Sequence, residues 1–100
     1  MTIERKPYDK GVELTVLGRI DTVTAPDLTA ALMPEFAGDA DQVTLNLAAV
    51  NYVSSAGLRT LLAAQKESKK RMKSFIIKNV VDEVMEVFSM TGFNDILTIE

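Results

Sequence analysis

Apolar and polar residues alternate along residues 12–17 and 43–48, and this two-residue period predicts two strands there. Three further short segments bring the number of expected strands to five. The predicted strands cover residues 2–8, 12–17, 43–48, 74–78 and 96–99. Pro7 lacks a backbone donor, so the first strand is expected at an edge of the sheet. A turn at Asp9-Lys10-Gly11 joins the first two strands as an antiparallel hairpin.

Between the later strands, apolar residues recur every three or four positions, which predicts three helices. Thr24 is the predicted cap of the first helix and Asn79 that of the third. The second helix is predicted from Leu58 to about Met72. Pro34 predicts a kink or an early end of the first helix, because it disfavours helical geometry and removes a backbone donor.

The resulting order, β-β-α-β-α-β-α-β, predicts an α/β fold with a mixed sheet of four to five strands. Strands separated by helices favour parallel pairing through right-handed crossovers, whereas the opening hairpin is antiparallel. Three or four helices are expected to pack on the sheet. The chain of 100 residues is long enough for one modest core, so one domain is expected over residues 1–100.

Composition excludes several classes of function. The chain contains neither cysteine nor histidine, which removes disulfides, thiolate zinc sites, cysteine nucleophiles and imidazole bases. No cofactor and no metal site are therefore expected. The net charge of −3 argues against nucleic acid as the main partner. No apolar run is long enough to span a membrane and MTIERKPYDK lacks the core of a signal peptide, so a cytoplasmic protein is expected.

The segment Lys66–Lys73 is rich in basic residues and has two interpretations. It could be a patch that binds anions or nucleic acid. Alternatively, it is a solvated surface whose cations suit the negative end of a helix. The acidic composition of the whole chain favours the second interpretation.

The segment from Asn51 to Leu58, NYVSSAGL, joins the central strand to the second helix. One of its two serines can cap the helix while the other is solvated, or the pair can act as a switch. Gly57 disfavours a helix by about 1 kcal/mol relative to alanine, and its missing side chain would let another molecule approach the backbone. Gly-rich phosphate-binding motifs are absent, and Ser55 has no histidine to activate it.

Three segments together resemble the STAS domain of bacterial anti-sigma factor antagonists. They are Gly18–Leu28 (GRIDTVTAPDL), Asn51–Leu58 (NYVSSAGL) and Phe88–Phe93 (FSMTGF). The resemblance covers nearly all of the chain in order. It implies a single STAS domain over residues 1–100.

In that family the phosphorylated hydroxyl lies two residues before the glycine, which implies Ser55, with Ser54 as second choice. Asp21 corresponds to an acid near the phosphorylation site. The resemblance also implies a partner-binding surface around this turn. Its residues are Asp21, Thr22, Thr24, Ser54, Ser55, Ala56, Gly57, Leu58 and Arg59.

The resemblance implies a regulator without catalytic residues. The unmodified protein would bind an anti-sigma factor, which is a serine kinase of the ATPase type, and so free a sigma factor. Phosphorylation of the serine would end the complex. A phosphatase would then remove the phosphate and restore the binding form. A monomer or weak dimer is expected. One alternative is a STAS interaction module of another bacterial signalling or transport complex, never phosphorylated. A small nucleotide-hydrolysing enzyme is a further alternative, which the absence of His, Cys and Walker motifs disfavours.

Overall fold

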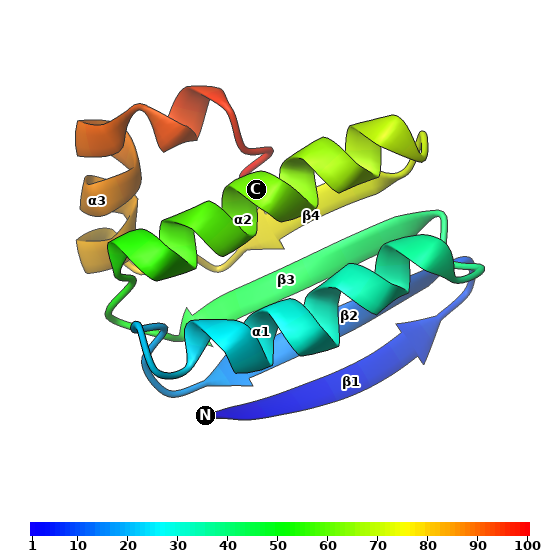
Figure 1. Cartoon of the computed structure of the whole chain (residues 1–100), viewed down its shortest axis with the longest axis horizontal. Helices are drawn as coiled ribbons and strands as arrows, with labels where there is room; N and C mark the ends of the chain where they lie inside the picture. Colours follow the sequence, from blue (N-terminus) through cyan, green and yellow to red (C-terminus); the bar gives the residue numbers. More distant parts are fainter.

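The computed structural model describes residues 1–100 and contains a four-stranded sheet with three α-helices (Figure 1). The strands are β1 (Thr2–Tyr8), β2 (Gly11–Leu17), β3 (Gln42–Ala49) and β4 (Ser74–Lys78). The helices are α1 (Ala25–Leu32), α2 (Ser55–Lys70) and α3 (Asp82–Thr91), with short 3-10 turns η1 (Met33–Ala37) and η2 (Phe93–Asp95). These elements confirm the predicted α/β fold.

The strand order is β1-β2-β3-β4. The hairpin strands β1 and β2 are antiparallel, whereas β2, β3 and β4 are mutually parallel, as predicted. Helices α1 and α2 lie side by side over one face of the sheet, and α3 stands at one end (Figure 1). Because the three parallel strands end at the same edge of the sheet, the loops that follow β2 and β3 lie next to each other.

The core lies between the sheet and α1 and α2, and it is formed by the residues that alternate along the strands. Val12, Leu14 and Val16 of β2 are buried, as are alternate residues of β3. Helix α1 ends at Leu32 and continues as the 3-10 turn η1, in which Phe36 is fully buried. This confirms the early end that Pro34 predicts, because proline cannot continue the helical hydrogen-bond pattern.

Two local predictions in the second half of the chain differ from the structure. Residues 96–99 do not form a strand: the segment contributes one isolated bridge, Ile77 to Ile99, because η2 occupies the preceding residues. Asn79 does not cap α3. It adopts a left-handed conformation with φ of 59°, which asparagine tolerates, and the helix begins only at Asp82 after Val81.

The bounds of α2 and the face of α3 that contacts the core depend on tertiary packing, which the sequence pattern does not show. Helix α2 begins at Ser55, three residues before the predicted start, and ends at Lys70. Met90, near the end of α3, is 79% exposed. Only Val84 and Phe88 of α3 are buried, because the helix covers the end of the sheet and contacts the core through a narrow stripe.

Candidate functional site

The two serines at the start of α2 have different environments. Ser54 has an extended backbone, and its Oγ accepts a hydrogen bond from the Gly57 N–H at 3.3 Å, so Ser54 caps the helix. Ser55 is the first residue of α2 and is exposed to solvent. The hydroxyl of Ser55 is thus accessible, whereas that of Ser54 is engaged in the cap.

The loop after β2 is held by hydrogen bonds between Asp21 and Thr24. Oδ1 of Asp21 accepts from the Thr24 N–H at 2.9 Å and from the Val23 N–H at 3.0 Å. Thr24 Oγ1 accepts from the Asp21 N–H at 2.9 Å. The hydrogen bonds that the carboxylate accepts, above all that from the Thr24 N–H, lower the pKa of Asp21, so this carboxylate is negative at neutral pH.

Thr24 occupies the cap position of α1, but its side chain makes no capping hydrogen bond. Its hydroxyl instead donates to the Arg19 carbonyl at 2.7 Å. The predicted cap is therefore right in position and wrong in contact, because the hydroxyl is already committed to the loop that precedes the helix.

A short parallel bridge joins the Asp21 loop to the serine turn. Ile20 and Val53 pair, the Ile20 N–H donates to the Tyr52 carbonyl at 3.0 Å, and the Ser54 N–H donates to the Ile20 carbonyl at 2.8 Å. Two hydrogen-bonded residues of the turn, Tyr52 and Ser54, thus flank the pairing of Val53 with Ile20. The relative position of Asp21 and the serines is set by backbone contacts.

Gly57 is buried beneath this bridge. A Cβ on Gly57 would lie 2.6 Å from Ile20 Cγ2 and 2.9 Å from Val53 Cγ1. The prediction that glycine leaves room for another molecule is therefore wrong. The close neighbours belong to the chain itself, and glycine is needed so that α2 can begin against Ile20 and Val53.

Two arginines, Arg19 and Arg59, flank the site. Only Arg59 was predicted as a site residue from the sequence. Arg19 lies over the Tyr52 ring, 4.2 Å from its centroid, and its Nε is 3.8 Å from Asp21 Oδ2. Arg19 precedes Asp21 in the chain, but sequence spacing alone contains no indication that it would reach Tyr52. Arg59 is exposed and lies four residues after Ser55 on α2.

Arg59 also lines a groove of about 440 Å³ between α1 and α2. The groove is lined by small residues together with Arg59: Thr22, Ala25, Pro26, Thr29, Ala56, Thr60 and Ala63. Across its floor, the hydroxyls of Thr29 and Thr60 are 2.9 Å apart and form a hydrogen bond. Small side chains leave the two helices accessible to a partner along their contact line.

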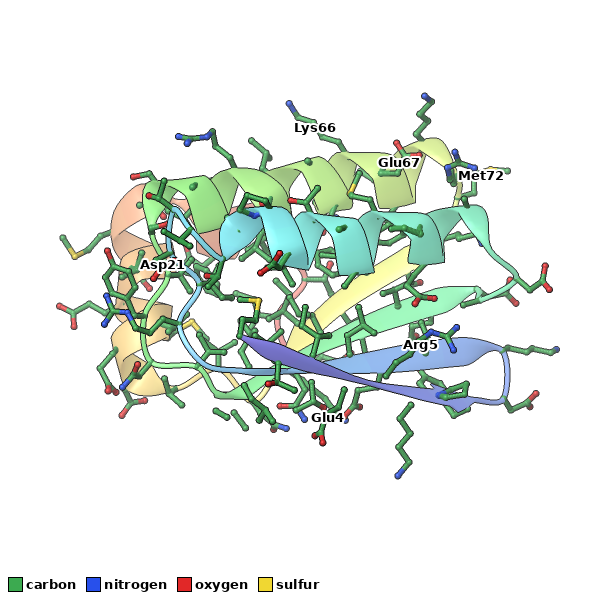
Figure 2. The ribbon with its side chains drawn as sticks, turned by 60° about the horizontal axis from the view of Figure 1, so that its bottom comes forward. Glu4, Arg5, Asp21, Lys66, Glu67 and Met72 are labelled. Atoms are coloured by element: carbon green, nitrogen blue, oxygen red, sulfur yellow. The ribbon has the colours of Figure 1, made fainter.

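The predicted partner-binding residues lie at the end of the molecule where α1 and α2 both begin, near Asp21 (Figure 2). Gly57 and Leu58 are buried, so they support this surface but do not form it. Lys66 and Met72 lie further along α2 and beyond it, toward the opposite end (Figure 2). The basic segment is therefore separate from the candidate site.

The structure brings together no group of three or more acidic residues that could hold a metal ion. None of its helices has the length and apolarity required to cross a bilayer.

The STAS domain model matches residues 2–100. The anti-sigma-B factor antagonist of Staphylococcus epidermidis is 30% identical over 97 residues, which cover 97% of this chain and 90% of that protein. The chain therefore belongs to the anti-sigma factor antagonists of the STAS family, which are non-enzymatic regulatory proteins.

Solved structures agree with this assignment. An anti-sigma factor antagonist from Mycobacterium paratuberculosis is 26% identical, with a TM-score of 0.88, and covers 98% of this chain and 83% of that one. The unphosphorylated antagonist SpoIIAA is 16% identical (TM-score 0.82, 99% and 88% covered). The phosphorylated form of SpoIIAA from Bacillus is 15% identical (TM-score 0.75, 99% and 91% covered). At these last identities the likeness concerns the fold.

Proposed function

We propose that this protein acts by partner switching, with residues 1–100 as one STAS domain. The unmodified protein binds an anti-sigma factor that is also a serine kinase of the ATPase type, and the bound sigma factor is released. Phosphorylation of Ser55 then breaks the complex. The observation that supports this most directly is the free, exposed hydroxyl of Ser55 beside the capping Ser54, in a chain related to anti-sigma-B factor antagonists.

In the phosphoryl transfer, Ser55 Oγ forms a bond to the γ-phosphorus of ATP. The bond between that phosphorus and the bridging oxygen of ADP breaks, and the hydroxyl proton passes to a base of the kinase. A phosphatase resets the protein by hydrolysis: a water oxygen bonds to phosphorus and Ser55 Oγ leaves as the alcohol. The antagonist itself needs no cofactor for either step and acts in the cytoplasm, where sigma factors function.

The phosphate changes the interface far more than the fold. It adds about −1.5 to −2 charges at the start of α2, where free N–H groups favour an anion by on the order of 1 kcal/mol. Buried in a complex, the same charge costs several kcal/mol, enough to weaken binding by about a hundredfold or more. The negative carboxylate of Asp21, in the loop that the bridge joins to the serine turn, also repels the phosphate. SpoIIAA has this fold in both phosphorylated and unphosphorylated forms, which supports a switch without unfolding.

The docking surface we propose consists of exposed and half-buried residues around the turn. Thr22, Ser55 and Arg59 form its exposed part, and the groove between α1 and α2 extends it. Asp21 and Thr24 keep the first loop in place through their hydrogen bonds. A monomer or weak dimer is sufficient for this role, because the whole surface lies within one chain.

The proposal is tested by the intact mass of the protein from its native cells, followed by mapping of the modified peptide. A single phosphate that Ser55→Ala abolishes and Ser54→Ala preserves is the expected result. Phosphate on Ser54 would move the switch by one residue. If no phosphate is found in any growth condition, even with the co-purified partner and ATP, the switch is refuted. A STAS module that assembles another signalling or transport complex would then describe the protein better.

A further inference from the structure

We propose that Arg59 is the intramolecular partner of a phosphate on Ser55, so that modification of the serine withdraws this arginine from the docking surface. The inference rests on the proposed function and names one residue that regulates that site. Arg59 takes no part in the phosphoryl transfer itself, because it interacts with the phosphate only after the transfer.

The geometry of α2 brings the two side chains together. Ser55 and Arg59 are four residues apart in the same helix and are both exposed. Residues at this spacing lie on one face, with Cβ atoms about 5–6 Å apart. Helical side chains lean toward the N-terminus, so the guanidinium of Arg59 reaches back toward the first turn, where the phosphate would stand.

Arg59 is also the cation that is available. Arg19 already interacts with the Asp21 carboxylate, at 3.8 Å, and with the Tyr52 ring. Arg59 takes part in none of the four ion pairs of the structure. The next cation along α2 is Lys66, eleven residues after Ser55, or about 16 Å along the helix axis.

The charges around the serine turn also favour pairing of the phosphate with Arg59. Asp21 is held in place by the Thr24 N–H and is negative, so a phosphate on Ser55 is repelled from the Asp21 loop and drawn toward Arg59. Before modification the rim of the groove has the positive charge of Arg59, which suits an acidic residue of the partner. After modification the Ser55–Arg59 pair has a net charge of about −1. Phosphorylation thus removes an attractive charge as well as adding a repulsive one.

The experiment is a titration of the full chain with phosphoserine installed at residue 55. The second pKa of the phosphate, ordinarily about 6, is followed by phosphorus NMR at low salt in the parent protein and in three variants. A nearby cation favours the dianion and lowers this pKa. We therefore expect Arg59→Gln to raise it by about 0.3 unit, the size of a helical ion pair at this spacing.

Arg59→Lys is the conservative variant and should keep most of the lowered pKa. Arg19→Gln is the matched control: it removes an arginine from the same site and should change the pKa by less than about 0.1 unit, since Arg19 is engaged elsewhere. Circular dichroism verifies that every variant is folded. An unchanged pKa in Arg59→Gln, or a larger change in Arg19→Gln, would overturn the proposal.

This titration uses neither a kinase nor an anti-sigma factor. The pairing with Arg59 can therefore fail while Ser55 is phosphorylated in cells, and it can hold even if no phosphate is found there. The two proposals are thus refuted by different results.

Discussion

Gly57 is the residue whose replacement tests most directly how the site is built. Its substitution by alanine adds one methyl group inside the bridge between the Asp21 loop and the serine turn. The new Cβ would lie 2.6 Å from Ile20 Cγ2, 2.9 Å from Val53 Cγ1 and 3.4 Å from the Ile20 carbonyl oxygen. The first two distances are shorter than any ordinary contact between carbon atoms.

Two effects of Gly57→Ala oppose each other. Alanine favours the helix by about 1 kcal/mol relative to glycine, whereas overpacking a buried site costs about 1–3 kcal/mol. Ile20 is fully buried, and its backbone is held on both sides by hydrogen bonds of 3.0 and 2.8 Å. Because neither neighbour can move away freely, we expect overpacking to win, with a net loss of about 1 kcal/mol.

Urea unfolding measures this loss, and thermal unfolding should show a decrease in Tm of about 4–8 °C. Gly38→Ala is the matched control. A Cβ there has only ordinary contacts, 3.6 Å to the Glu35 carbonyl oxygen and 4.0 Å to that of Pro34, and φ is −89°. Its stability should change by less than about 0.5 kcal/mol or rise. If Gly57→Ala equals or exceeds the parent protein in stability, close packing does not explain this glycine.

Three further predictions concern stability. Ser54→Ala should lower the free energy of unfolding by about 1 kcal/mol through loss of the cap, whereas Ser55→Ala should leave it within about 0.5 kcal/mol in the same urea assay; equal losses would contradict the assigned cap. Gln65 has a buried Oε1 without a hydrogen-bond partner, so Gln65→Leu should raise the free energy of unfolding by about 1 kcal/mol, and a lower Tm would contradict this. The hydrogen bond from Lys78 lowers the pKa of Glu13, so its contribution is present above the ordinary carboxyl pKa and is lost as pH falls through the lowered value. Lys78→Met should therefore reduce stability at neutral pH more than at about pH 3, and an equal reduction at both would refute the linkage.

Much of the fold was predictable because its determinants are local. A strand or an amphipathic helix can be recognised from the period of its apolar residues within one segment. The end of α1 follows from Pro34, and the end of α3 follows from Gly92, which adopts a φ of 78°. The cap at Ser54 likewise depends on one contact within four consecutive residues, from Ser54 to Gly57. The motifs around Asp21 and Ser55 could be recognised in the sequence because each lies within one short segment.

Other features depend on residues that are distant in sequence. Ile20 and Val53 are brought together because β2 and β3 run parallel and end at the same edge of the sheet, and this contact explains Gly57. The position of Arg19 over Tyr52 depends on the same juxtaposition. Local periodicity determined which segments are strands and helices, except at residues 96–99, which form one isolated bridge and no strand. Only the packing of the parallel strands decided which loops meet, because side-chain spacing along one segment contains no information about the segment that lies beside it.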